Sequence, residues 1–386
     1  MSLGRAAGRV VLCVAMTLVA GLAPAQALLD FTPQERTLIA GHGPWPPTPA
    51  VDHANRVQAK PAAVAFGRLL FFEPALSADG KVACASCHQP ERAFQDGLPV
   101  ALGAAAGLRN TPSLLDVAQR RWLGWDGAHD SLCAASVTPL VAPREMAADT
   151  AQLAAVVRKT ARLAAAYREV FGVSPGQGGE GLLVDLGKAL AAYQATLVSG
   201  RTPFDDFRDA LQRGDLSAAG RYPLAAQRGL RLFIGDGRCN VCHAGPSFSN
   251  GEFADVGLPH FVQGGVDGGR LEGLHRLRAS PLNRLGPHND AGAADPRAVT
   301  TRHVQPLHRN FGEFRVPGLR QLVHTAPYMH DGSLAHIEDV VGHYSELNEE
   351  RLHSDGERIL RPLKLTPGLA ADLAAFLRSL SSPSAR

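Results

Sequence analysis

Apolar residues recur at every third or fourth position in three stretches of the chain, which is the spacing of one face of an α-helix. These stretches are 150–171, 182–197 and about 366–380. In the last stretch, Thr366 is placed to cap a helix and Pro367 to occupy its first turn. Strand-like alternation is scarce, and residues 261–304 are rich in Gly, Pro and Arg, which is typical of a loop. The pattern therefore predicts a mainly α fold with extensive irregular loops.

The N-terminal residues have the layout of an export signal. Arg5 and Arg9 precede an apolar stretch at 10–22, and a small-x-small cleavage site ends at Ala27. The apolar stretch is shorter than the roughly 20 residues that cross a bilayer. No later run of the sequence is long and apolar enough to cross a membrane. We therefore expect residues 1–27 to be a signal peptide and the mature protein to be periplasmic, without a membrane span.

Two Cys-x-x-Cys-His pentads carry the strongest chemical signal in the chain. Their thiols are those of Cys84, Cys87, Cys239 and Cys242, and their histidines are His88 and His243. Two thiols at this spacing can add to the two vinyl groups of one haem, and the adjoining imidazole can bind its iron. A redox dithiol does not need the histidine, and a zinc site needs four converging ligands. The pentads therefore predict two covalently bound c-type haems, with His88 and His243 as proximal ligands.

The passages around the two pentads echo each other. Each has an apolar run that ends in aromatic residues, then a glycine, the pentad, a phenylalanine and a second glycine turn. The matching positions are 69–72 and 230–233, Gly80 and Gly237, Phe94 and Phe248, and Gly97 and Gly251. Such an internal duplication predicts two cytochrome c-like haem domains, which we place at 28–210 and 211–386.

The remaining cysteines and the net charge limit which further bonds and partners the sequence allows. Of the 6 cysteines, Cys13 lies in the predicted signal and four belong to the pentads. Cys133 is left over and is expected to be a buried thiol, because free cysteine packs like a small apolar residue. The formal net charge of +3 is small for 386 residues. It argues against a nucleic acid partner and leaves the choice of an electron-transfer partner open.

Short motifs surround the pentads in a fixed order. They occupy 71–80, 109–115, 125–127, 139, 145–146, 245–248, 316–320, 325–332 and 343–344. With them the chain, from about 62 to 380, resembles the bacterial di-haem cytochrome c peroxidase and MauG family. The resemblance implies a first, peroxidatic haem and a second haem that transfers electrons.

The resemblance also implies the contents of the first haem pocket. Glu145 matches the distal acid that moves a proton while a bound peroxide is cleaved; otherwise it is a solvated surface residue. Pro139 matches a residue of the same pocket, or is an ordinary turn proline. Relatives often carry glutamine where this chain has Ala135, so we expect slower turnover or a different oxidant. No histidine lies between His88 and His129, which favours an always-open, five-coordinate iron.

Three further roles follow from the resemblance. Trp125 matches a tryptophan between the haems, where it can pass electrons, although an aromatic residue is more often core. The sixth ligand of the second haem is Tyr344, as in MauG-like members, or Met329, with His343 or an open site as the remaining alternatives. A phenolate favours ferric iron, whereas a thioether favours ferrous iron.

A calcium ion between the haems is the third implied cofactor. Asn110, Thr325 and Pro327 match positions that bind it in relatives, the last two through backbone carbonyls, and oxygen ligands suit this cation. Other histidines are expected to be structural or solvent-facing: His324, His330 and His336.

Three functions remain open from the sequence. The favoured one is a periplasmic peroxidase that reduces hydrogen peroxide with electrons from a small cytochrome c or cupredoxin. The second is a MauG-like oxidase that withdraws electrons from side chains of a partner protein, which Tyr344 and the missing distal histidine favour. The third is a non-enzymatic electron carrier, in which both haems are six-coordinate and Glu145 has no role.

Overall fold

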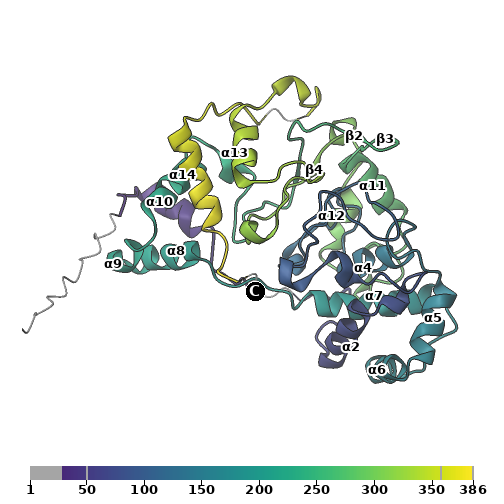
Figure 1. Cartoon of the computed structure of the whole chain (residues 1–386). Helices are drawn as coiled ribbons and strands as arrows, with labels where there is room; N and C mark the ends of the chain where they lie inside the picture. Colours follow the sequence, from purple (N-terminus) through teal and green to yellow (C-terminus); the bar gives the residue numbers. More distant parts are fainter. Residues whose placement is uncertain (1–27, 49–50, 357–358, 385–386) are drawn as a thin grey trace, which may run out of the picture.

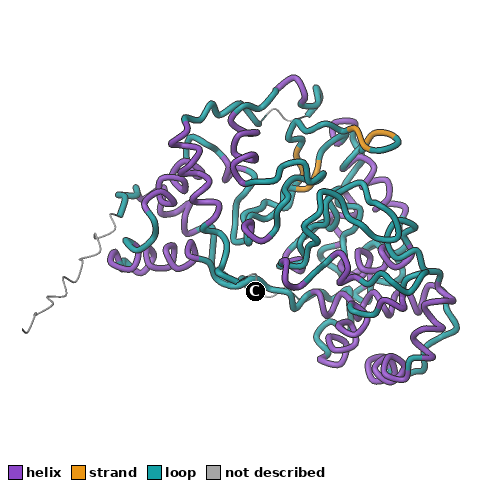
Figure 2. The backbone as a smooth tube through the Cα atoms, viewed as in Figure 1, coloured by secondary structure: helices purple, strands orange, loops and turns teal. Residues whose placement is uncertain are grey.

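The computed structural model of the protein describes residues 28–48, 51–356 and 359–384 (Figure 1). Helices and irregular loops make up nearly all of this part, with very little strand (Figure 2). The predicted mainly α fold is therefore confirmed. No helix of these residues is long and apolar enough to cross a membrane. The predicted signal peptide, 1–27, lies outside the described residues.

Helices and two small antiparallel ladders follow one another along the chain. The helices are α1 (Pro33–Ala40), α2 (Pro61–Phe71), α3 (Cys84–Cys87), α4 (Leu132–Val141), α5 (Thr150–Lys159), α6 (Ala161–Phe171), α7 (Glu180–Gln194), α8 (Pro203–Arg213), α9 (Leu216–Ala219), α10 (Leu224–Ile234), α11 (Arg270–Ala279), α12 (Ala298–His303), α13 (Ile337–Ser345) and α14 (Pro367–Arg378). The strands are β1 (Phe253–Ala254), β2 (Phe261–Val262), β3 (Gly265–Val266) and β4 (Phe314–Arg315). Strand β1 pairs with β4, and β2 pairs with β3.

Two hydrophobic cores organise the described chain. The first is built from α2 and α4–α7, and the second from α1, α8, α10, α13 and α14. Figure 1 shows these two groups of helices as two lobes. Phe31 and Ile39, together with Phe204 and Phe207 of α8, pack in the second core. The division at residue 210 stays a prediction, but the second core also draws on residues that precede it.

The same helix crossing occurs in both lobes, where the helix before each pentad packs on a later helix. A Cβ atom on Gly67 of α2 would lie 1.9 Å from the carbonyl oxygen of Ala189 in α7. A Cβ atom on Gly229 of α10 would lie equally close, 1.9 Å, to the carbonyl oxygen of Asp372 in α14. Only glycine permits such a close backbone approach. The repeated crossing gives the duplication read from the sequence a structural counterpart.

The helical stretches expected from the apolar pattern all form helices, with one break. Stretch 150–171 divides into α5 and α6 at Thr160, whose backbone is extended. The six-residue gap between the buried Val157 and Leu163 does not fit one continuous apolar stripe. Thr366 caps α14 as expected, since its hydroxyl accepts from the backbone NH of Leu369 at 3.4 Å.

Residues 261–304 are not a plain loop, so that expectation is wrong. They form the β2–β3 hairpin and helices α11 and α12. Helix α11 contributes only Leu274 and Leu277 to a small core with Trp122. Its leucines are interrupted by charged residues at 270, 272, 276 and 278, so the apolar pattern is too sparse to predict a helix.

Candidate functional site

The first pentad forms a single helical turn that fixes its histidine. The backbone NH of His88 donates to the carbonyl of Cys84 at 2.9 Å. Its Nδ1 lies 2.9 Å from the carbonyl oxygen of Phe94. Because a carbonyl can only accept, Nδ1 carries the proton and Nε2 keeps its lone pair for a metal.

The second pentad repeats this arrangement. The backbone NH of His243 donates to the carbonyl of Cys239 at 2.9 Å, and its Nδ1 lies 2.9 Å from the carbonyl oxygen of Phe248. Phe94 and Phe248 both have left-handed backbone angles, with φ of 60° and 53°. This conformation is uncommon outside glycine, and here it accompanies the same carbonyl-to-imidazole contact twice. Sequence reasoning found the echo of the two phenylalanines and missed what their carbonyls do.

Both imidazoles and three of the thiols lie in surroundings that disfavour charge. Burial lowers the pKa of His88 and of His243, which keeps each ring neutral as a metal ligand requires. Burial also raises the pKa of Cys84 and Cys239 to about 12, and that of Cys87 to about 11. Surroundings that keep thiols uncharged also suit neutral thioethers at the edge of an apolar ring.

A cavity of about 700 Å³ lies against the second pentad. Cys239, Cys242 and His243 line it, and its apolar walls come from residues such as Phe233, Ile337, Val341, Leu373 and Leu377. Such a volume is typical of cofactor sites. Two thiols and a neutral imidazole therefore face an apolar space, as a haem attached at Cys239 and Cys242 requires.

Both candidate sixth ligands, Tyr344 and Met329, reach this cavity. Burial raises the pKa of Tyr344, and the nearby thiols of Cys239 and Cys242 add to the shift. His343 is turned toward another partner, because its Nε2 lies 2.8 Å from the carbonyl oxygen of Val256. The phenol of Tyr344 and the thioether of Met329 therefore line the same cavity, and both remain candidate ligands.

The expected inter-haem residues line the same cavity. Trp125, Asn110, Thr325 and Pro327 all border it. The indole NH of Trp125 donates to the carbonyl of Asn110 at 2.9 Å, and the backbone NH of Arg315 donates to the carbonyl of Trp125 at 2.7 Å. Trp125 is therefore held by hydrogen bonds to both halves of the chain.

The expected distal residues follow one another at the end of α4. Pro139 lies inside the helix and removes the hydrogen bond to the carbonyl of Ala135. The chain then turns back, with the backbone NH of Met146 donating to the carbonyl of Pro139 at 3.0 Å. This turn places Glu145 close enough to the first pentad for its charge to raise the pKa of both Cys84 and Cys87.

The carboxyl of Glu145 is both reachable by water and crowded by protein. The residue is exposed by surface area, yet burial raises the pKa of its carboxyl. Protein atoms therefore surround the carboxyl more closely than they surround the rest of the residue.

Cys133 and three histidines expected to have no role in the chemistry are the last predicted residues to place. Cys133 lies against α7, with its Sγ 3.7 Å from the carbonyl oxygen of Val184, and burial raises its pKa to about 12. His330 stacks on Phe314 with ring centres 3.5 Å apart, and the Nε2 of His324 lies 2.9 Å from the carbonyl oxygen of Ser382. His336 is exposed at the start of α13.

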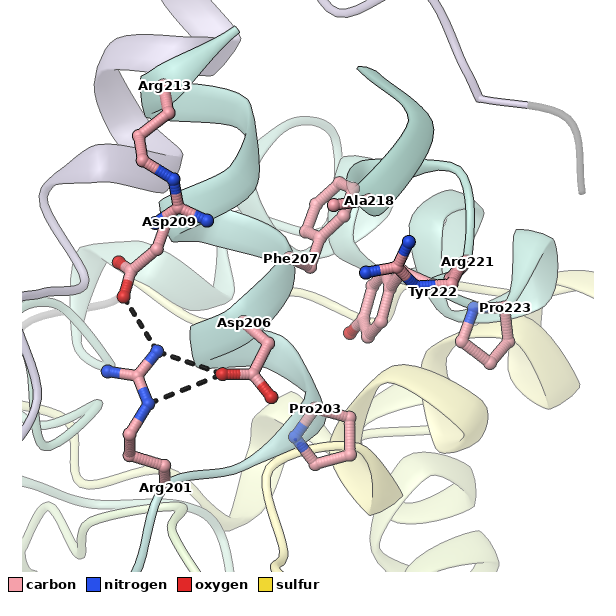
Figure 3. Close-up of a pocket in the computed structure, with 10 residues that line it drawn as sticks. All are labelled: Arg201, Pro203, Asp206, Phe207, Asp209, Arg213, Ala218, Arg221, Tyr222 and Pro223. Atoms are coloured by element: carbon pink, nitrogen blue, oxygen red, sulfur yellow. Dashed lines mark hydrogen bonds and ion pairs between the residues drawn. The ribbon is translucent and has the colours of Figure 1, made fainter. Parts of the chain in front are cut away.

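A second hollow, of about 470 Å³, lies over α8 and α9, away from the expected chemistry. Figure 3 shows Arg201 between two carboxylates of α8. Arg201 bonds Asp206 at 2.9 Å and Asp209 at 2.7 Å. None of the residues expected at a haem lines this hollow, so we assign it no part in the chemistry.

Comparison with known proteins agrees with this geometry. The sequence profile of a family described as di-haem cytochrome c peroxidase matches residues 61–213. The methylamine utilization protein MauG of Methylorubrum extorquens is 34% identical over 335 residues, which cover 86% of this chain and 82% of that protein. The chain belongs to the di-haem cytochrome c peroxidase and MauG family.

Other family members resemble the chain over similar lengths. Cytochrome-c peroxidase IdrP1 of a Pseudomonas species is 31% identical, over 88% of this chain and 86% of that protein. The diheme peroxidase BthA of Burkholderia thailandensis has a TM-score of 0.64 and 26% identity, covering 87% of this chain and 90% of that one. A MauG-like protein associated with microbial copper homeostasis has a TM-score of 0.65 and 27% identity, covering 89% of this chain and 97% of that one.

Family membership settles the class of chemistry. Members are di-haem peroxidases and MauG oxidoreductases, so this chain is an oxidoreductase of the di-haem type. The named relatives include both peroxidases and MauG proteins, and the choice between these activities depends on the site of this chain.

Proposed function

We propose that this protein is a periplasmic di-haem c-type peroxidase that reduces hydrogen peroxide with electrons from a small cytochrome c or cupredoxin. Two haems, attached at Cys84 and Cys87 and at Cys239 and Cys242, would supply the iron that binds peroxide and holds oxidising equivalents. In the overall reaction, one hydrogen peroxide takes up two electrons and two protons and leaves as two water molecules.

The position of Glu145 carries the proposal. Cleavage of the O–O bond needs a group that takes the proton from the inner oxygen and delivers it to the outer one, which leaves as water. Glu145 lies beside the first pentad, and burial raises the pKa of its carboxyl, so this carboxyl binds a proton more readily than an exposed glutamate does. A surface glutamate far from the pentad would have no such role.

The other residues have positioning and ligand roles in this proposal. His88 and His243 are the proximal ligands, each oriented through its Nδ1 by a backbone carbonyl. Pro139 shapes the turn that carries Glu145. Trp125 lies between the two halves and would carry electrons from the second haem to the first.

A calcium ion is part of the proposal on the ground of resemblance. Asn110, Thr325 and Pro327 border one cavity, and oxygen atoms of their side chains or backbone suit calcium. Bound there, the ion would hold the loop at 325–327 against Asn110.

The proposed function is tested on the purified mature protein by titration with dithionite and then with peroxide. We expect two haems per chain and a high-spin ferric signal that is lost rapidly on addition of peroxide. Two six-coordinate irons that do not respond to peroxide would contradict the proposal and leave the electron carrier as the alternative.

A MauG-like oxidase is the second candidate, and Tyr344 at the cavity wall favours it. A phenolate ligand stabilises ferric iron and so suits a haem that stores oxidising equivalents for a slow partner. The two functions are distinguished by adding reduced cytochrome c or cupredoxin after peroxide. Rapid oxidation of either donor supports the peroxidase, whereas oxidising equivalents that persist despite both donors support the oxidase.

A further inference from the structure

Two arginines at the wall of the 700 Å³ cavity lack the partners that buried arginines usually have. Arg315 is 5% exposed, and its guanidinium donates only to the carbonyls of Gly124 at 3.2 Å and Val316 at 3.3 Å. Arg120 donates to the carbonyls of Ser113 at 2.8 Å and Leu115 at 2.9 Å. Among the described residues, no carboxylate forms an ion pair with either one.

Asp116 is the acid whose charge acts on Arg120, but it does not form an ion pair with that arginine. Asp116 attracts Arg120 electrostatically, but its two carboxylate oxygens already accept from the backbone NH and the hydroxyl of Ser199, at 2.8 and 2.7 Å. Burial lowers the pKa of Arg120 to about 10. Burial also lowers the pKa of Arg315 to about 9, and the nearby charge of Arg120 adds to this shift. Two like charges thus lie close together in surroundings that disfavour charge.

Other buried arginines among the described residues are stabilised by carboxylates or aromatic rings. Arg208 bonds Asp205, and Arg284 bonds Asp295 and Asp52, each at 2.7 to 2.9 Å. No carboxylate of the described residues forms an ion pair with Arg270, but its guanidinium carbon lies 3.9 and 4.4 Å from the centres of two aromatic rings. A buried charge without compensation costs several kcal/mol, about as much as a domain can spare. The surroundings of Arg120 and Arg315 are therefore suited to an anion.

The place of the two arginines identifies the anion. Both line the cavity that Cys239, Cys242 and His243 also line. A haem carries two propionate carboxylates on the edge opposite its vinyl groups, and guanidinium binds carboxylate with paired hydrogen bonds. We propose that Arg120 and Arg315 bind the propionates of the haem attached at Cys239 and Cys242, an inference that rests on the proposed function.

This assignment links the cofactor to the electron path. The Arg315 guanidinium carbon lies 5.9 Å from the Trp125 ring centre, and the charge of Arg120 reaches His88 of the first pentad. Positive charge beside a haem favours ferrous iron. The two arginines would therefore raise the potential of the haem attached at Cys239 and Cys242.

The test is the midpoint potential of each haem in mature protein carrying Arg315→Gln or Arg120→Gln. Haem content is measured first: wild-type protein with fewer than two haems contradicts the proposed function and not this inference. With two haems bound, each variant is expected to weaken reduction of the six-coordinate haem about tenfold, a fall of about 59 mV for a one-electron couple. Arg315→Lys keeps the charge and is expected to retain most of the wild-type potential.

Arg162→Gln is the matched control. Arg162 does not line the cavity, its side chain is 60% exposed, and it pairs with Glu73, so its loss is expected to leave both potentials unchanged. Equal potentials in Arg315→Gln, Arg120→Gln and this control would overturn the inference, as would a shift confined to the first haem. If Arg315→Gln does not bind two haems, Arg120→Gln and Arg315→Lys decide in the same way.

Discussion

At the scale of single residues, the chemistry of this protein depends on where backbone carbonyls and a few buried side chains lie. In each pentad, the Nδ1 proton of the histidine is donated in a hydrogen bond to the carbonyl of a phenylalanine with left-handed backbone angles. A hydrogen bond of this kind orients the imidazole ring and makes its other nitrogen a stronger ligand for a metal. Glu145 is set apart from an ordinary surface glutamate by its raised pKa and by its closeness to Cys84 and Cys87.

Replacement of Glu145 tests its proton-transfer role. Glu145→Gln is expected to slow the reaction of the ferric protein with peroxide by about 10²- to 10⁴-fold, because a positioned acid–base group contributes that much. The carboxylate must be ionised to accept a proton. Since its pKa is raised, the wild-type rate falls with decreasing pH already above the ordinary glutamate value of 4.5.

Stopped-flow mixing with peroxide across pH measures both effects. Glu145→Gln is expected to give a flat profile over the range in which the wild-type rate falls. A variant that reacts as fast as the wild type would remove Glu145 from the mechanism.

Replacement of the two candidate sixth ligands decides the coordination of the second haem. If Tyr344 binds the iron, Tyr344→Phe changes the spectrum of the six-coordinate haem and raises its potential, because an anionic ligand that favours ferric iron is lost. Met329→Leu is then expected to leave that spectrum unchanged. The reverse pattern assigns Met329 instead, and absorption and resonance Raman spectra of both variants distinguish the cases.

At the scale of secondary-structure elements, one helix crossing is used twice. Helix α2 meets α7 at Gly67, and α10 meets α14 at Gly229. Each crossing lies just before a pentad, so it sets the position of the following thiols and histidine.

Gly229→Ala tests the close approach of α10 to α14. Its methyl group would meet the Asp372 carbonyl, so the helices must separate, and the free energy of unfolding is expected to fall by about 1–3 kcal/mol. Gly181→Ala in α7 is the matched control, since a Cβ atom there meets nothing within 4 Å, and it is expected to be neutral or stabilising by about 0.4–1 kcal/mol. Thermal unfolding of the two mature variants provides the measurement, and equal stabilities would show that the crossing tolerates a side chain.

At the scale of the whole molecule, buried ion pairs join residues that are distant in the sequence. Arg109 forms a bidentate pair with Asp267, at 2.6 and 2.7 Å, and also bonds Asp126. Arg276 of α11 bonds Asp126 as well. Burial by itself would raise the pKa of Asp126, but the charges of Arg109 and Arg276 outweigh it and lower the pKa. This network holds the loop that carries Trp125 against the second half of the chain.

Asp126→Asn is expected to destabilise the protein by about 1.5–3 kcal/mol, because hydrogen bonds to a buried charged group contribute about that much, while Arg109 keeps its bidentate pair with Asp267. Glu252→Gln is the control. It breaks an exposed pair with Arg121, whose side chains are 55% and 56% exposed, and is expected to cost less than about 1 kcal/mol. Denaturant unfolding at neutral pH compares the two, and equal losses would show that the network does not stabilise the junction.

Sequence reasoning succeeded where a pattern has a local physical cause. The period of apolar residues predicted α7 and α14, and the Thr366-Pro367 pair located the start of α14. It failed at α11, where two leucines against Trp122 are too few to produce a readable stripe. The motif match proposed Glu145 and Trp125 as site residues, but nothing local indicated Arg120 or Arg315, since their surroundings come from segments far apart in the chain.

By itself, the sequence determined the mainly α class, the duplication and the two candidate haem attachment sites, because helical periodicity and thiol spacing depend on neighbouring residues alone. Only the tertiary structure decided which carbonyl orients each histidine, which residues share the 700 Å³ cavity and which arginines lack a carboxylate. Those features arise where distant segments meet, and burial and electrostatic compensation at such a meeting depend on all of them together.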